Sequence, residues 1–388
     1  MIRSFYPQGF RCLSCAAIIN EALETGLPGV TSDLKPWPHS GCFSVCSRCG
    51  HVQKLLDQDW NDDISKIYGQ YEMYSVSGGE EQRIFDNGLP LPRSMKLVEN
   101  LRQTWMLPSE GKILDFGCGN GAFLRSFSRL FSEWKLNGFD LDSRFADALS
   151  HIEKFYELYG GSLAQIEEFF DLITMVYVIE HLTNPRTILE QLRCLLKAEG
   201  ALLVQTSSFD DNPFDLMVVD HCSHFSEHTL SSLVVKAGFS VARVTQGWIA
   251  KEIGLIAVPV IDGDRSFRSS DFVQNQSAGL EGSLKWLEKV VLHAKSVGMR
   301  QDLGIFGTAI AGTWLANALG DKFSFFLDED PSRIGRTHLG RPIRHPTEVK
   351  SNSSAYLAFP WKMAKTMHER LAAAYPTVNF LLPPANEP

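Results

Sequence analysis

The sequence lacks long apolar runs and lacks an excess of basic residues. No stretch of about 18 apolar residues occurs, so no membrane-spanning helix and no membrane partner are expected. Its 37 Lys and Arg are outnumbered by 45 Asp and Glu, giving a net charge of −8. Phosphate-binding surfaces are usually basic, so nucleic acid is not an expected partner. The opening MIRSFYPQGFRCLSC has no continuous apolar signal segment, which favours a cytoplasmic protein.

Cysteine is concentrated at one end, with five of the eight residues before position 50. Cytoplasmic thiols stay reduced or bind metal. Two C-x-x-C pairs, Cys12 with Cys15 and Cys46 with Cys49, are typical of a structural four-thiolate zinc site, because each short turn directs both sulfurs at one ion. Reduced thiols without a ligand are the alternative. Three nearby side chains could compete as ligands: Cys42, His39 and His51.

The strongest motif is GKILDFGCGNGAFLRSF at residues 111–127. A short apolar run ending in Asp115 predicts a buried strand, and the apolar periodicity of AFLRSFSRLF predicts a helix. A strand, a glycine-rich turn and a helix form a nucleotide-binding unit, because glycines let backbone amides approach a ligand. The glycines of the turn are Gly117, Gly119 and Gly121. A second predicted strand ends at Asp140, where a carboxylate can bind ribose hydroxyls.

This stretch resembles the class I S-adenosylmethionine (SAM) dependent methyltransferases, and the resemblance continues over about residues 90–260. It implies an α/β fold with a seven-stranded sheet and SAM at the carboxyl ends of the first two strands. By this resemblance, Asp115 and Gly117 lie near the methionine portion and Asp140 lies at the ribose. Ser162 and Leu163, after Gly160, are then the candidates for the adenine region. A Rossmann-like domain without a ligand remains the alternative.

The last third of the chain contains a second strand–turn–helix pattern. Residues 262–278 are polar and irregular and predict a linker, followed by an amphipathic helix in LKWLEKVVLHAKSV. LGIFGTAIAGTWLANALG and KFSFFLDED then predict a Rossmann-like unit whose second strand ends at Asp328. The glycine spacing departs from G-x-G-x-x-G. A degenerate domain that closes the substrate cleft is therefore expected, with NAD binding as an alternative.

The order of these parts resembles that of the sugar-nucleotide C-methyltransferases, which act on nucleoside-diphosphate keto sugars. The tail motif DEDPSRIGRTHLGRPI carries this resemblance together with the cysteine-rich head. It implies a zinc-binding domain at 1–70, a SAM-dependent methyltransferase domain at 71–261 and a Rossmann-like substrate domain at 262–388. The implied cofactors are SAM and structural Zn²⁺, and the implied small-molecule substrate is a nucleoside-diphosphate sugar, methylated at carbon.

Methyl transfer needs an acceptor atom in line with the donor methyl and usually a base that removes a proton. His181 follows the predicted fourth strand and His221 follows the fifth, both at the expected cleft. By the same resemblance, Asp220 and His221 form an acid–histidine pair, with the imidazole as base. Tyr71 and Tyr74 match a tyrosine-rich substrate loop. Val218 stands where the family has a tyrosine, and GGEEQ departs from the loop pattern.

Three other functions remain open from the residues. O-methylation of a sugar or another secondary metabolite needs only a base beside a hydroxyl. An NAD-dependent sugar-modifying enzyme would use the tail. A SAM-binding protein without catalytic activity would use the glycine turn alone.

Overall fold

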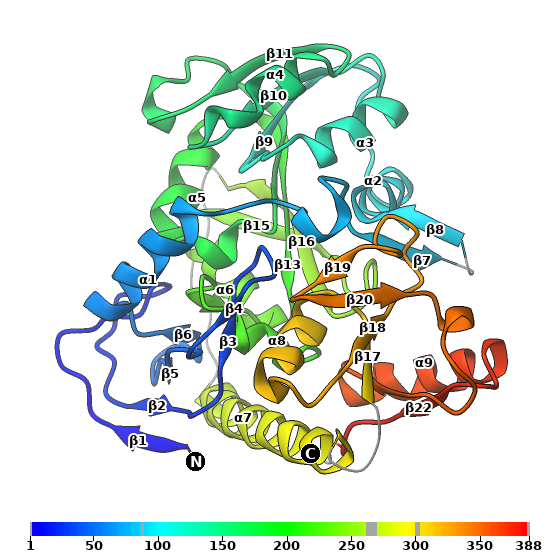
Figure 1. Cartoon of the computed structure of the whole chain (residues 1–388). Helices are drawn as coiled ribbons and strands as arrows, with labels where there is room; N and C mark the ends of the chain where they lie inside the picture. Colours follow the sequence, from blue (N-terminus) through cyan, green and yellow to red (C-terminus); the bar gives the residue numbers. More distant parts are fainter. Residues whose placement is uncertain (1, 87–88, 261–269, 299–302, 386–388) are drawn as a thin grey trace.

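The computed structural model describes residues 2–86, 89–260, 270–298 and 303–385. Three main sheets follow one another along the chain, and Figure 1 shows them packed side by side around one central region. The fold is mixed α/β with a mostly parallel central sheet, as the sequence predicts. No helix among the described residues is long and apolar enough to cross a membrane.

The central sheet has seven strands in the order β11-β10-β9-β12-β13-β16-β15. The first five are parallel, whereas β16 is antiparallel to both of its neighbours. The number of strands and the place of the glycine turn after β9 agree with the prediction. The strands are β9 (Lys112–Phe116), β10 (Lys135–Phe139), β11 (Phe155–Tyr159), β12 (Phe170–Val176), β13 (Leu196–Ser207), β15 (Phe239–Val244) and β16 (Glu252–Pro259).

Helices cover both faces of this sheet. Successive residues of a strand point to opposite faces, so neighbouring residues pack against different helices. Ile113 of β9 packs into a cluster with residues of α2 and α3, whereas its neighbour Leu114 packs into a cluster with α5 and α6. The carboxyl ends of the parallel strands therefore form the open edge of the domain. The helices are α2 (Arg93–Thr104), α3 (Ala122–Leu130), α4 (Ala146–Ser150), α5 (Pro185–Cys194) and α6 (Glu227–Lys236).

The cysteine-rich head forms a five-stranded sheet whose last strand comes from the central part of the chain. Ser223 of β14 pairs with Gln53, and His224 pairs with Val52. This pairing joins the loop after β13 to β6, the strand that follows the second cysteine pair. The strands are β1 (Arg3–Phe5), β2 (Ala22–Glu24), β5 (Cys42–Val45), β6 (Val52–Lys54) and β14 (Ser223–His224). Helix α1 (Gln58–Gly69) follows β6 in the chain.

Two short hairpins connect the head to the other parts. The hairpin of β3 (Gly29–Val30) and β4 (Pro36–Trp37) contacts α8, where Asn317 Nδ2 donates to the carbonyls of Gly29 and Trp37 at 2.9 and 2.8 Å. Val30 also forms a parallel bridge with Val218. The second hairpin is β7 (Arg83–Asp86) with β8 (Leu89–Pro92).

The C-terminal part is a six-stranded sheet in the order β19-β20-β18-β17-β21-β22, parallel except for β19. Helices α7 and α8 cover one face and α9 covers the other. This agrees with the predicted Rossmann-like unit. The elements are α7 (Ser270–Gly298), β17 (Leu303–Phe306), α8 (Ile310–Leu319), β18 (Phe325–Leu327), β19 (Thr337–His338), β20 (Arg341–Arg344), β21 (Ser354–Leu357), α9 (Trp361–Ala374) and β22 (Asn379–Leu381).

The predicted linker at 262–278 is wrong over its second half. Helix α7 begins at Ser270, eight residues before the predicted end of the linker, whereas residues 262–269 lie outside the described residues. The polar composition concealed the helix. Gln276 and Leu280 are buried, so only a narrow stripe of this first part of α7 faces the protein.

Candidate functional site

The glycine turn after β9 has the conformation that its motif predicts. Gly117, Gly119 and Gly121 have φ of 76°, 48° and 79°, in the left-handed region that glycine tolerates best. A Cβ on Gly117 would lie 2.4 Å from Val178 Cγ2, so a larger residue does not fit. Asp115 is buried at the end of β9, and Thr174 Oγ1 donates to its Oδ1 at 2.7 Å. Burial raises the pKa of Asp115 to about 7.

Asp140 follows β10 and holds the turn from the other side. Its Oδ2 accepts from the Gly119 amide at 2.8 Å and its Oδ1 from the Asp142 amide at 2.9 Å. The predicted adenine candidates lie farther along the same edge. Ser162 is an exposed N-cap, whereas Leu163 is buried in the apolar cluster between the sheet and α5.

One cavity of about 250 Å³ joins this turn to the predicted acceptor residues. Its lining includes Asp115, Gly117 and Gly119 of the glycine turn and the strand before it. Its other walls come from segments far apart in sequence, and they bring together four of the predicted catalytic residues. These are Tyr71, Tyr74, His181 and His221.

His221 is held by Asp215 and not by Asp220, which corrects the predicted acid–histidine pair. His221 Nδ1 donates to Asp215 Oδ1 at 2.8 Å, and His224 Nδ1 donates to Oδ2 at 2.7 Å. Asp220 and His221 do not form this pair, because their side chains, although consecutive in the loop, point in different directions. Although burial lowers the pKa of His221, the adjacent Asp215 carboxylate outweighs it, so the pKa lies above its ordinary value.

Asp220 belongs instead to the environment of His181. Its backbone oxygen accepts from His181 Nδ1 at 2.9 Å. Its carboxylate accepts from the amide and the hydroxyl of Ser32 at 2.8 and 2.5 Å. Ser32 Oγ also lies 3.2 Å from the Tyr71 hydroxyl. The turn of the β3–β4 hairpin thus reaches from the head to the cavity, where Ser32 contacts Asp220 and Tyr71.

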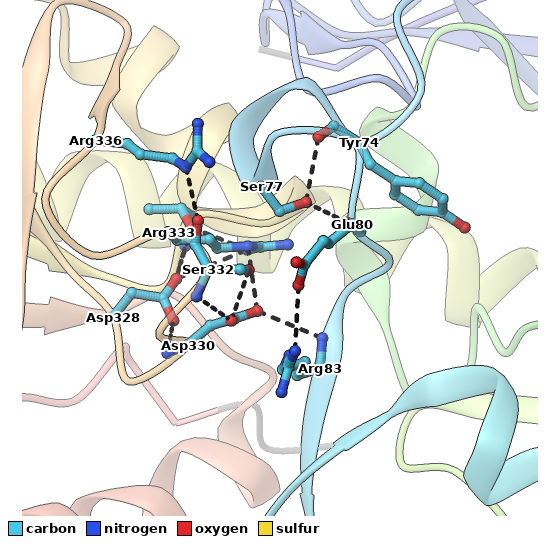
Figure 2. A network of polar contacts seen from close by, with 10 residues as sticks. Tyr74, Ser77, Glu80, Arg83, Asp328, Asp330, Ser332, Arg333 and Arg336 are labelled. Atoms are coloured by element: carbon cyan, nitrogen blue, oxygen red, sulfur yellow. Dashed lines mark hydrogen bonds and ion pairs between the residues drawn. The ribbon is translucent and has the colours of Figure 1, made fainter. Parts of the chain in front are cut away.

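The C-terminal part closes the other side of the cavity through Ala309, Ile310 and Arg333. Figure 2 shows Asp328, Asp330 and Arg333 gathered beside the segment that carries Tyr74 and Ser77. Asp330 Oδ2 accepts from the Arg83 amide at 3.4 Å. A Cβ on Gly78 would lie 2.4 Å from Arg336 Nη2, so the two segments are in close contact.

Asp328 directly follows β18, where a dinucleotide-binding fold would place its ribose-binding acid. Here its Oδ2 accepts from the amide and the hydroxyl of Thr308, at 3.2 and 2.6 Å. Arg333 Nη1 donates to the same hydroxyl at 2.9 Å. The Asp328 carboxylate, on which the NAD alternative depends, is therefore already hydrogen-bonded within the chain.

The four cysteines of the two C-x-x-C pairs come together in the head. Cys12 Sγ lies 3.6 Å from Cys49 Sγ, and Cys15 Sγ lies 3.6 Å from Cys46 Sγ. A tetrahedron with Zn–S bonds of about 2.3 Å has edges of about 3.8 Å, so the sulfurs fit one zinc ion. The competing ligands lie elsewhere. His39 pairs with Asp63, His51 Nε2 lies 3.1 Å from Ser223 Oγ, and Cys42 is outside the cluster.

Residues 92–244 match a family model described as a methyltransferase domain. A tRNA U34 carboxymethyltransferase of Campylobacter hominis is 28% identical over 191 residues, covering 46% of this chain and 64% of that relative. A ubiquinone biosynthesis O-methyltransferase of Glaesserella parasuis is 29% identical over 123 residues, covering 28% and 50%. The chain thus spans between half and two thirds of these relatives.

A solved structure of the mitomycin 7-O-methyltransferase MmcR is similar with a TM-score of 0.39 and 16% identity, covering 43% of this chain and 54% of that one. The sheet order and the glycine turn define a class I, Rossmann-like nucleotide-binding core. With the family match, residues 92–244 are a SAM-dependent methyltransferase domain.

Three residues at or beside the cavity were not predicted from the sequence. Asp215 lies only six residues before His221, and its signal was an acid at the start of the same loop. Ser32 and Arg333 had no comparable signal, because they reach the cavity from the head and the tail. Only the tertiary packing places them there.

Replacing Asp115 with asparagine is expected to weaken SAM binding by about 10- to 100-fold, since a hydrogen bond to a charged group contributes about 1.5–3 kcal/mol. Isothermal titration calorimetry at pH 8, where the carboxylate is ionised, measures the change. Asp147→Asn, on the exposed surface of α4, is the matched control. Unchanged affinity in Asp115→Asn would remove this residue from the donor site.

Proposed function

We propose that this chain transfers a methyl group from SAM to a carbon or oxygen atom of a small molecule. The observation that carries the proposal is the shared cavity, which the glycine turn and two histidines line together. SAM, when bound, supplies the methyl group already activated as a sulfonium. Asp115 and the turn would hold its methionine portion, and Asp140 would hold its ribose.

In this proposal the residues of the chain orient the acceptor and remove one proton. His221 is the base, because it lines the cavity and Asp215 fixes its Nδ1–H, which leaves the lone pair of Nε2 to accept a proton. His181 and the hydroxyls of Tyr71 and Tyr74 orient the acceptor. The methyl-bearing sulfur leaves as a neutral thioether, so a nucleophilic cysteine is not needed.

The acceptor that we propose is a nucleoside-diphosphate keto sugar, methylated at the carbon next to the ketone. The cysteine-rich head, the methyltransferase domain and the Rossmann-like tail support it by their resemblance to enzymes of that class. The division at 1–70, 71–261 and 262–388, with structural zinc in the first part, belongs to the same proposal. The tail's Arg333 lines the cavity, where it is also paired with Asp328 and Asp330.

O-methylation is the second candidate, since relatives named as O-methyltransferases match the domain. The absence of a tyrosine at Val218 also removes one donor that would stabilise an enolate. Incubating the full chain with methyl-labelled SAM and matched keto and non-keto nucleotide sugars separates the two. Label at carbon supports the first proposal, label at oxygen supports the second, and no label on any sugar would overturn the sugar assignment.

Asp215→Asn is expected to move the acid limb of the pH–rate profile to lower pH and to reduce the maximal rate. A base works only when unprotonated, and Asp215 keeps the pKa of His221 above its ordinary value. Without that carboxylate, His221 loses its proton at a lower pH and also loses its fixed orientation. The profile of kcat/KM for wild type and variant tests this, with the exposed Asp62→Asn as control. A limb that stays in place would mean that another group titrates.

A further inference from the structure

Three potential metal ligands meet on the acceptor side of the cavity. Glu180 and His181 lie in the single turn η4 (Ile179–His181) after β12, and His221 lies in the loop after β13. One ligand atom from each lies within 4.8 Å of the other two. The two imidazole rings are perpendicular, with centroids 4.7 Å apart. All three residues line the cavity.

Both histidines have one ring nitrogen already engaged. His221 Nδ1 contacts the Asp215 carboxylate and His181 Nδ1 contacts the Asp220 backbone oxygen, at 2.8 and 2.9 Å. The Asp215 carboxylate and the Asp220 oxygen only accept, so both Nδ1 atoms carry the proton, and the Tyr68 hydroxyl, 3.2 Å from His181 Nδ1, is a second acceptor for that proton. Both Nε2 atoms then have a free lone pair when the rings are neutral. Metal-binding histidines usually have this second contact to a carboxylate or carbonyl, which orients the ring.

Glu180 provides the second, independent observation. It is only 2% exposed, and its Oε2 has no hydrogen-bond partner among the described residues. A buried carboxylate is costly unless it is paired. The neighbouring acids are paired within the protein, Asp215 by two histidines and Asp220 by Ser32. The methyl transfer proposed above gives Glu180 no role, so a cation is the partner that its position calls for.

We propose that Glu180, His181 and His221 bind one divalent first-row transition-metal ion. Two imidazoles and one carboxylate suit Mn²⁺, Fe²⁺, Co²⁺ or Zn²⁺ and leave coordination positions open toward the cavity. The site is distinct from the four-thiolate cluster of the head, whose softer ligands favour Zn²⁺ over the harder Mn²⁺. Its effect on turnover rests on the proposed function. An ion on His221 Nε2 occupies the lone pair that accepts the proton, so bound metal slows methyl transfer.

Electron paramagnetic resonance of Mn²⁺ tests the binding, because this hard ion does not compete well for thiolates. The full chain is first loaded with one zinc per chain and freed of excess metal. We expect one further Mn²⁺ per chain, displaced by added Zn²⁺, which binds nitrogen and oxygen ligands more tightly. If the spectrum in the presence of the wild-type protein shows only free Mn²⁺, the proposal is overturned.

Glu180→Gln and His181→Ala are each expected to weaken Mn²⁺ binding at least about 10-fold. Glu167→Gln, on the exposed surface, is the matched control and should bind as wild type does. Thermal denaturation establishes that each variant is folded, and either variant suffices if the other is not. Undiminished Mn²⁺ binding in a folded variant would place the ion elsewhere and overturn the site.

Turnover distinguishes this proposal from the proposed function. Under the proposal, methyl transfer by wild type falls as the second site fills and returns when the ion is washed out. Full turnover with the ion bound would overturn the competition between the ion and the proton at His221. An enzyme that transfers no methyl group to any acceptor would overturn the proposed function, while the Mn²⁺ measurements would still decide the site.

Discussion

Replacing His221 with alanine is expected to lower the rate of methyl transfer by about 100- to 10,000-fold, the usual contribution of a positioned general base. SAM affinity should change little, because the proposal assigns SAM binding to the glycine turn and Asp115 and not to His221. Asp215 would also lose one of the two histidines that donate hydrogen bonds to its carboxylate, so the variant is expected to be less stable at neutral pH.

Initial rates with the identified acceptor, together with calorimetric SAM binding, measure the two effects separately. His151→Ala is the matched control, because this histidine is exposed and its Nδ1 lies 2.7 Å from the backbone oxygen of Asp147, away from the cavity residues. A folded His221→Ala protein with wild-type turnover would show that the base is another group. Lost SAM binding would show instead that the variant disturbs the whole cavity.

Replacing Cys46 with serine is expected to have the largest effect on stability. If the four sulfurs hold structural zinc, the ion contributes on the order of 10 kcal/mol to folding of the head. The effect should extend to the cavity, because β6 follows the second cysteine pair and pairs with β14, in the loop that carries His221. We expect loss of one zinc per chain, a strongly lowered Tm and loss of methyl transfer.

Metal analysis by mass spectrometry and thermal denaturation test this expectation. Cys42→Ser and Cys194→Ser are the controls, because neither sulfur belongs to the cluster and Cys194 is exposed. Both should keep the zinc. Cys46→Ser protein with the full metal content and an unchanged Tm would disprove the structural role.

Local sequence signals predicted the parts of the fold that local physics controls. The motif at 111–127 predicted β9, the glycine turn and α3, because backbone conformation and burial there follow from adjacent residues. The two C-x-x-C pairs predicted which sulfurs meet, although they lie some thirty residues apart, since a shared ion is the simplest use of paired thiols. Asp328 was located correctly at the end of a strand, but its contacts were not foreseen.

The acceptor side was predicted only in part, because it is assembled from contacts between distant segments. His181, His221, Tyr71 and Tyr74 were found by their position after strands or in a loop, and all four line the cavity. The orientation of the His221 side chain was not predicted, because the directions of successive side chains in an irregular loop follow no fixed period. Ser32 lies 188 residues from Asp220, and no local pattern indicates such a pairing.

The β3–β4 hairpin limits how this protein can be recombined with its relatives. Its turn supplies Ser32 to Asp220, its first strand bridges Val218, and α8 holds both of its strands. A chimera that exchanges residues 92–244 alone would keep a donor pocket but would set a foreign catalytic loop against this hairpin. Exchange of acceptor preference between relatives therefore requires residues 29–37, the loop at 218–224 and α8 to be transferred as one unit.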